Sequence, residues 1–292
     1  MPSDLKVNEI SCKTAIGKCG FPSGGYSINP FLGCGHACVY CYARFMKRFS
    51  SGHTNDEWGS FVDVKMNIAN ALEKQLTSKK KFDCNQMIFL GTVTDPFQFL
   101  EKKYLISQQV LSVLLSLKIK NPISILTKSD LILRDLNQLL EFKSIEVNFT
   151  INSLNQDFIN LVEPNAPSVK ARLIAAKKLV AAGIKTNVML GPYWPNQDFT
   201  DAQKLFEEFS KIGVSEIHSE SFNSTGGNFS GVENALKNKF PVELASMKEI
   251  LFNKTKFDDF YKQAKTELTE LSREFKIPVS VYFGQGHDKF KN

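Results

Sequence analysis

The chain has 292 residues, which is long enough for one large or two ordinary domains and for a core that folds without disulfides. Hydrophobic residues make up 42% and charged residues 23%, which excludes a disordered or fibrous protein, and no apolar stretch approaches the ~18 residues of a membrane-spanning helix. The net charge of +6 permits a nucleic-acid partner but does not require one, because scattered lysines also suit an ordinary solvated surface.

The first half of the chain alternates strand-like and helix-like segments after a polar leader, residues 1–24. This leader has no signal-peptide pattern, so we expect a cytoplasmic protein without membrane contact. Hydrophobic periodicity predicts, in chain order, a strand at 25–30, a helix at 61–76, a strand at 86–92, a helix at 105–120, a strand at 122–128, and a helix at 131–140 with Asp130 as its N-cap.

The second half continues the alternation and then breaks it. The predicted segments are a strand at 145–152, a helix at 167–183 with Gly183 as its C′ residue, a strand at 184–192, a helix at 201–213 with Gly213 past its end, and a strand at 214–222. Residues 223–256 interrupt the alternation of strands and helices and are expected to form an insertion or lid. A helix at 258–275 and a strand at 277–284 follow.

Six strand–helix units in succession predict parallel strands joined by right-handed crossovers. The apolar runs at 86–92, 122–127 and 145–151 are continuous, as expected for strands covered on both faces. Because no G-x-G-x-x-G follows the first strand, a closed or partial β/α barrel fits better than a doubly wound sheet. We predict an α/β fold, a partial (β/α)6 TIM-type barrel over 25–222, with residues 223–292 packing on it as an insertion and carboxyl-terminal extension.

The loop after the first strand, NPFLGCGHACVYCYARF, contains Cys34, Cys38 and Cys41 in the spacing C-x3-C-x2-C. Clustered cysteines in a cytoplasmic protein more often bind metal or do chemistry than form disulfides. A structural zinc needs four ligands, but His36 is cramped between two of these cysteines and no later C-x2-C completes a zinc ribbon. A [4Fe–4S] cube held by three thiolates leaves one iron open for a chelating substrate. The loop also lies at the strand end where β/α barrels place their chemistry.

This motif, with Tyr40 directly before its last cysteine, resembles the signature of radical S-adenosylmethionine (SAM) enzymes. The likeness covers roughly 25–195 and is narrower than the superfamily. The chain resembles the spore photoproduct lyase-related, DNA repair photolyase-like group in NPFLGCGHACVYCYAR, VTDPFQ (93–98), ILTKSDLILRD (125–135), TINS (150–153), EPNAPSVKAR (163–172) and AGIKTNVMLGPYWP (182–195).

The resemblance implies a radical SAM core, a [4Fe–4S] cluster and SAM as cofactors, and a reductant such as flavodoxin or ferredoxin. In such enzymes the open iron binds the amino and carboxylate groups of SAM. An electron from the cluster cleaves the sulfonium carbon–sulfur bond, and the resulting 5′-deoxyadenosyl radical abstracts hydrogen from the substrate. Cys34, Cys38 and Cys41 are then the catalytic metal ligands.

The resemblance also implies which residues contact SAM. Those expected near the methionine amine are Thr92, Thr94 and Asp95. Those expected near the carboxylate or ribose are Lys128, Ser129, Asn152, Ser153 and Arg172. Those expected near the adenine are Tyr42, Met189 and Leu190, and Tyr40 is a further cofactor contact.

Simpler interpretations remain open for several of these residues. Tyr42 can be a core aromatic, Asp95 a turn residue before a proline, and Lys128 part of a strand exit and helix cap. Arg172 can belong to a solvated helix face. An additional candidate pair, which shares one face of the sixth strand, is His218 and Glu220.

Three functional hypotheses follow. The first is a radical SAM enzyme, lyase-like or modifying, that acts on a nucleic-acid lesion or base; it suits the group resemblance and the basic residues Arg44, Lys47 and Arg48, which alternate with Phe45 and Phe49. The second keeps this chemistry but takes a peptide, protein or small metabolite, with 223–256 as the specificity pocket. The third is a non-catalytic metal-binding module.

The other cysteines set one limit on the resemblance. Spore photoproduct lyases proper use a further cysteine as hydrogen donor, and the strand-exit motifs TDPF, TKS and INS contain none, which argues against that specific lyase activity. The sequence assigns no role to Cys12, Cys19 or Cys84 and does not set the oligomeric state.

Overall fold

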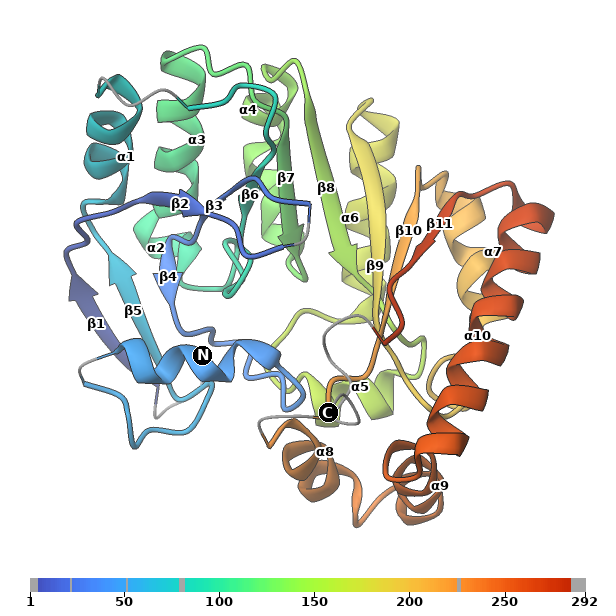
Figure 1. Cartoon of the computed structure of the whole chain (residues 1–292). Coiled ribbons are helices and arrows are strands. Elements are labelled where there is room, and N and C mark those ends of the chain that lie inside the picture. Colours follow the sequence, from blue (N-terminus) through green and yellow to red (C-terminus); the bar gives the residue numbers. More distant parts are fainter. Residues whose placement is uncertain (1–4, 22, 51, 79–81, 225–226, 285–292) are drawn as a thin grey trace.

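The computed structural model describes residues 5–21, 23–50, 52–78, 82–224 and 227–284 (Figure 1). Its main sheet has eight strands in the spatial order β2–β3–β6–β7–β8–β9–β10–β11, and all neighbours are parallel except β2 and β3. The strands are β2 (Ile16–Lys18), β3 (Tyr26–Ile28), β6 (Ile88–Leu90), β7 (Ile123–Thr127), β8 (Ile145–Thr150), β9 (Lys185–Tyr193), β10 (Ile217–Ser221) and β11 (Val279–Val281).

From β3 to β10 the spatial order of the strands follows their order in the chain, as in a β/α barrel. This confirms the predicted α/β class with parallel strands. Within the described residues the sheet stays open, with β2 and β11 at its edges. The helices that cover the back of the sheet in Figure 1 are α3 (Ile106–Ser116), α4 (Leu136–Leu140), α6 (Val169–Ala181) and α7 (Ala202–Ile212).

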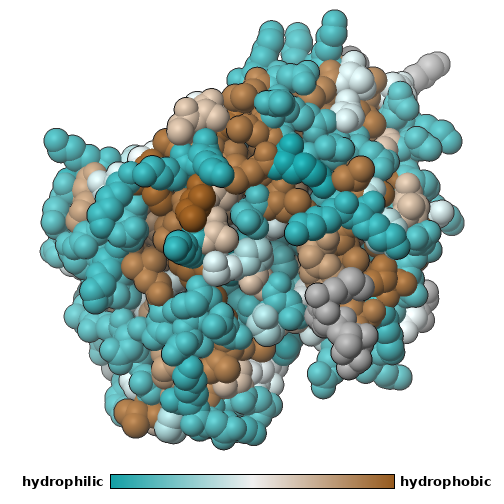
Figure 2. Space-filling view, turned by 180° about the vertical axis from the view of Figure 1, so that it is seen from behind, coloured by the Kyte–Doolittle hydropathy of each residue, from teal (hydrophilic) through white to brown (hydrophobic). Residues whose placement is uncertain are grey.

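The sheet is buried on both faces, which explains its continuous apolar runs. Ile123, Ile125, Val147 and Phe149 share one face and are fully buried, and full burial of such a side chain stabilises the fold by about 1.5–3 kcal/mol. On the opposite face Ser124 and Asn148 are buried as well. Seen from behind, hydrophilic residues cover most of the surface, with hydrophobic ones in patches between them (Figure 2). Within the described residues, no helix is long and apolar enough to cross a membrane.

A second, smaller sheet was not expected from the sequence. It consists of β1 (Lys6–Ile10), β5 (Phe61–Lys65) and β4 (Phe31–Leu32), with β5 in the middle. The predicted helix at 61–76 was therefore wrong over its first five residues, and α1 (Ile68–Thr77) begins later. The residues of β5 pair with two strands and are buried. The stabilisation from this pairing and burial outweighs the helical periodicity of their sequence.

The helix predicted at 131–140 starts differently from expectation. Ser129, not Asp130, caps it, because the Ser129 hydroxyl accepts a hydrogen bond from the Leu131 N–H at 3.2 Å. A 3-10 helix, η2 (Asp130–Asp135), precedes α4. By contrast, Gly183 and Gly213 follow α6 and α7 as predicted, and both have the positive φ that glycine allows, +86° and +82°.

The carboxyl-terminal part lies beside the ends of the parallel strands. Residues 228–251 contain two helices, α8 (Asn228–Leu236) and α9 (Pro241–Leu251), below the sheet in Figure 1. A long helix, α10 (Lys254–Phe275), then leads back to β11 at the sheet edge. Two short helices, α2 (Glu101–Tyr104) and α5 (Gln156–Val162), follow β6 and β8.

Hydrogen bonds of His53 stabilise the small sheet. This side chain is 4% exposed and lies between two carboxylates. Its Nδ1 is 2.6 Å from Asp56 and its Nε2 is 2.8 Å from Asp63. Asn8 on β1 donates to Asp63 at 2.9 Å, and Lys6 pairs with Asp56 at 2.6 Å. Burial acts to lower the pKa of His53, but the hydrogen bonds to Asp56 and Asp63 outweigh it and raise that pKa above its ordinary value.

We expect His53→Gln to lower the free energy of unfolding by about 1 kcal/mol at pH 5.5 and by less at pH 8.5. A folded-state pKa above the unfolded one gives stability that is complete below the unfolded pKa and is lost as the pH rises through the folded pKa. Urea unfolding of both proteins at the two pH values measures this. An equal loss at both pH values would contradict the charged role of His53.

Candidate active site

A cavity opens at the carboxyl ends of the parallel strands, between the cysteine loop and the ends of β6 to β10. Most residues predicted from the resemblance line it. They are Cys34, Cys38, Tyr40, Cys41, Tyr42, Thr92, Thr94, Asp95, Lys128 and Met189. The predicted residues that are not part of its lining are Ser129, Asn152, Ser153, Arg172 and Leu190.

These five residues have protein partners instead. Asn152 donates to the Gly191 carbonyl at 3.1 Å, and the Ser153 hydroxyl accepts from the Asn155 N–H. Leu190 is fully buried in the core. Arg172 is also fully buried, so a solvated helix face was wrong for it. Their contacts with SAM stay predictions.

The cysteine loop is held to the end of β6 by backbone contacts. The Thr94 hydroxyl donates to the Gly33 carbonyl at 2.6 Å, and the Gly35 N–H donates to the Gln98 side chain at 2.7 Å. A Cβ on Gly35 would lie 2.4 Å from the Phe99 ring, so this close approach requires glycine. The loop's path is thus fixed by its neighbours before any ligand binds.

The three cysteine thiols are free and turn to one cavity. Cys34 and Cys38 are buried, and burial is the main cause that raises the pKa of Cys34 to about 12 and the pKa values of Cys38 and Cys41 above their ordinary range. Among the described residues, no three His, Cys, Asp or Glu side chains are placed to hold a single metal ion. Three thiols on one cavity wall are a donor set that suits an iron–sulfur cluster.

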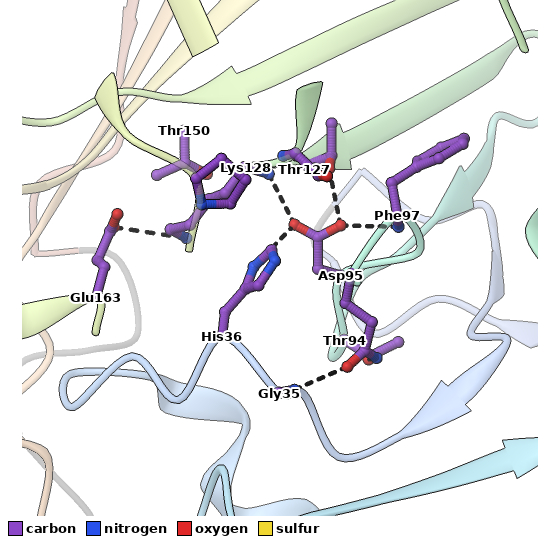
Figure 3. Close-up of polar contacts among 12 residues, drawn as sticks. Gly35, His36, Thr94, Asp95, Phe97, Thr127, Lys128, Thr150 and Glu163 are labelled. Atoms are coloured by element: carbon purple, nitrogen blue, oxygen red, sulfur yellow. Dashed lines mark hydrogen bonds and ion pairs between the residues drawn. The ribbon is translucent and has the colours of Figure 1, made fainter. Parts of the chain in front are cut away.

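Asp95 joins the cysteine loop to two strands (Figure 3). One carboxylate oxygen accepts from the Thr127 hydroxyl at 2.7 Å and from the Phe97 N–H at 2.8 Å. The other accepts from the Lys128 N–H at 2.7 Å and lies 3.3 Å from His36 Nδ1. Burial lowers the pKa of His36 more than Asp95 raises it.

A buried charge cluster stands on the other side of the loop. The Glu163 carboxylate accepts hydrogen bonds from the Tyr40 hydroxyl and the Arg172 guanidinium, and the Lys128 ammonium lies 3.9 Å away (Figure 3). Burial acts to raise the pKa of Glu163, but Arg172 and Lys128 outweigh it and lower that pKa. One carboxylate thus faces two cations, which leaves positive charge beside the cavity, where Lys128 lies.

Glu220 lies on the wall formed by β10 and was only a secondary candidate in the sequence. Its carboxyl makes no hydrogen bond within the described part of the chain. Burial raises the pKa of Glu220 to about 7, and Lys128 opposes that rise. Gly191 on β9 leaves room for it, since a Cβ there would lie 2.9 Å from Glu220 Cγ. His218, the other member of the pair, does not line the cavity and packs against Tyr282.

Sequence reasoning also missed five polar residues of the lining as site residues, namely His36, Thr127, Thr150, Ser221 and Asn223. Thr127 and Thr150 stand inside the segments ILTKS and TINS, so the segments were recognised but these positions were not selected. Side chains alternate between the two faces along a strand, and this pattern could have identified Thr127. Its hydroxyl contacts Asp95 at the carboxyl end of β7.

Comparison with known proteins identifies a family. The family model described as the Radical SAM superfamily matches residues 28–206. An uncharacterized protein of Methanocaldococcus jannaschii is 33% identical over 208 residues, which are 71% of this chain and 74% of that protein. An uncharacterized protein of Acidianus two-tailed virus is 29% identical over 249 residues, 80% of each chain.

Two solved structures have a similar fold. Spore photoproduct lyase complexed with dinucleoside spore photoproduct superimposes with a TM-score of 0.69 at 18% identity, over 95% of this chain and 82% of that chain. Streptococcus suis SuiB bound to precursor peptide SuiA gives a TM-score of 0.52 at 14% identity, over 89% of this chain and 48% of that chain. At these identities the likeness concerns the fold.

We expect Glu220→Gln to raise the free energy of unfolding by about 2 kcal/mol at pH 8 and to change it little at pH 5. The folded-state pKa of about 7 lies above the ordinary value of 4.5, so stability falls as the pH rises through 7 and the unpartnered carboxylate becomes charged. The matched control is Glu216→Gln, directly before the same strand and outside the cavity lining.

Urea unfolding of the three proteins at both pH values is the measurement. A Glu220→Gln variant that is no more stable than wild type at pH 8, or that gains no more than Glu216→Gln, would contradict the buried, unpartnered position of this carboxyl.

Proposed function

The chain belongs to the radical SAM superfamily of enzymes, and on that premise we propose that Cys34, Cys38 and Cys41 hold a [4Fe–4S] cluster. The observation that carries this proposal is that the three thiols line one cavity at the carboxyl ends of the parallel strands. The other cysteines, Cys12, Cys19 and Cys84, are not part of that lining. Three thiolates ligate three irons of the cube and leave the fourth for the amino and carboxylate groups of SAM.

When bound, the cluster supplies the electron that cleaves SAM to methionine and a 5′-deoxyadenosyl radical; a donor such as flavodoxin or ferredoxin provides that electron. The chain's part is to bind and orient SAM. Lys128, supported by Arg172 and Glu163, presents positive charge that suits the SAM carboxylate. On the opposite side the Tyr42 hydroxyl donates to the Thr92 carbonyl, which sets its ring at the cavity wall as a neighbour for the adenine.

The chain also limits side reactions. Hydrocarbon side chains in the lining come from three strand ends, at Val93, Leu126 and Met189. They keep water and polar hydrogen donors away from a reactive carbon radical. The rest of the cavity would hold the substrate carbon from which hydrogen is taken.

The proposed substrate is a nucleic-acid lesion or base. Its support is the net charge of +6 and the fold shared with spore photoproduct lyase, which was solved with a dinucleoside photoproduct. A peptide is the second candidate. It is favoured by the fold shared with SuiB, which was solved with a precursor peptide.

We expect Cys34→Ala, Cys38→Ala and Cys41→Ala each to lose at least ~100-fold in reductive SAM cleavage, because a missing thiolate removes a cluster ligand. The assay is anaerobic reconstitution with iron and sulfide, then 5′-deoxyadenosine formation in dithionite. The matched control is Cys84→Ala, because Cys84 is an exposed free cysteine outside the cavity lining.

Reconstituted wild type should carry about four irons per chain, and Cys84→Ala should match wild type in both iron content and 5′-deoxyadenosine. Stoichiometric zinc in place of iron, or undiminished cleavage in the three active-site variants, would refute the proposal and favour a non-catalytic metal-binding module.

A further inference from the structure

The 3-10 helix η1 (Tyr42–Phe49), which directly follows Cys41, exposes a row of aromatic rings. The exposed fractions are 37% for Tyr42, 40% for Phe45 and 64% for Phe49. In Figure 1 it is the blue helix beside the lower end of β1 and β5. Exposed apolar area on this scale, gathered on one short helix, is typical of a surface that binds a partner.

The rings are evenly spaced and interleaved with positive charge. The ring centroids of Tyr42 and Phe45 are 6.5 Å apart, and those of Phe45 and Phe49 are also 6.5 Å apart. The Arg48 guanidinium lies 5.2 Å from the Phe45 centroid and 5.3 Å from the Phe49 centroid. Lys47 adds a second charge in the last turn, and the helix YARFMKRF contains no acidic residue.

The row leads into the catalytic cavity. Tyr42 belongs to the cavity lining, whereas Phe45 and Phe49 do not. The position of the helix is fixed at its start, because the Tyr42 hydroxyl donates to the Thr92 carbonyl and the Arg44 guanidinium donates to the Gly227 carbonyl at 2.8 Å. A ligand that lies along η1 therefore has one end at the cavity mouth.

Aromatic rings and basic charges in alternation suit a single strand of nucleic acid. Stacking of a base on an exposed ring contributes about 1–3 kcal/mol per base, and nearby lysine or arginine contacts the phosphates. A duplex hides its base faces, so it gains nothing from the rings. An acidic electron-donor protein would use the charges and bury the rings in its interface, so slower reduction of a ring-deleted variant is what identifies such a partner.

We propose that η1 docks single-stranded nucleic acid, with bases stacked on Phe45 and Phe49, phosphates beside Lys47 and Arg48, and the next base directed past Tyr42 into the cavity. The docking itself needs neither cluster nor SAM. Only the last step, chemistry on the delivered base, rests on the proposed function.

The test is fluorescence anisotropy of the full chain with a labelled oligothymidylate of about 12 nucleotides. We expect the double variant Phe45→Ala/Phe49→Ala to bind at least ~10-fold more weakly than wild type with an unchanged salt slope. We expect Lys47→Gln/Arg48→Gln to flatten the slope of log K against log salt by about one to two units. The matched control, Phe252→Ala, removes a ring that is 53% exposed next to α9 and should bind like wild type.

If wild type does not bind the oligonucleotide, or if the double variant binds it as tightly as wild type does, the proposal is overturned. Tighter binding of a matched duplex overturns the single-strand assignment. If the double variant keeps its oligonucleotide affinity but is reduced more slowly by flavodoxin, η1 is an electron-donor docking surface instead.

Failure of the proposed function is seen separately. Wild type that binds the strand but forms no 5′-deoxyadenosine refutes the cluster chemistry and leaves the docking intact. Wild type that forms 5′-deoxyadenosine but does not bind the strand refutes the docking alone.

Discussion

The candidate site depends on one buried carboxylate, Asp95, which lies between the cysteine loop and two strand ends. Its two oxygens face the Thr127 hydroxyl, two backbone N–H groups and the imidazole of His36. A buried carboxylate without such partners would cost several kcal/mol, so the sequence that supplies Asp95 must also bring these donors to it. Because His36 stands between Cys34 and Cys38, satisfying Asp95 also places the thiols at the cavity wall.

Electrostatics divide the cavity into two unlike walls. Beside the cysteine loop, Lys128 and Arg172 share the carboxylate of Glu163, which places the Lys128 ammonium at that wall together with the carboxylate of Asp95. Across from it, Glu220 is held near neutrality by burial, with its pKa raised to about 7. Such an asymmetry orients a ligand that has a carboxylate at one end and a neutral, hydrogen-bonding group at the other.

Local sequence patterns predicted what depends on neighbours in the chain and missed what depends on neighbours in space. The parallel strands were predicted because burial on both faces leaves apolar runs, and the cavity residues at strand exits because barrel topology collects them. The strand at 61–65 was missed because its partner is in the leader. A solvated helix face stayed open as an alternative for Arg172, because nothing in helical periodicity reveals the Glu163 carboxylate that pairs with it. The Glu220 side chain fits beside Gly191 on the adjacent strand because glycine has no Cβ. The sequence alone does not show that these two residues are neighbours.

The most direct test of the account is electron paramagnetic resonance of the anaerobically reconstituted, dithionite-reduced protein with and without SAM. Three cysteine ligands and one open iron predict a reduced [4Fe–4S] signal whose g values shift when SAM is added, because SAM coordinates the cluster itself. A cluster signal that is identical in the presence of saturating SAM would contradict the account, since it would mean that SAM does not coordinate the cluster.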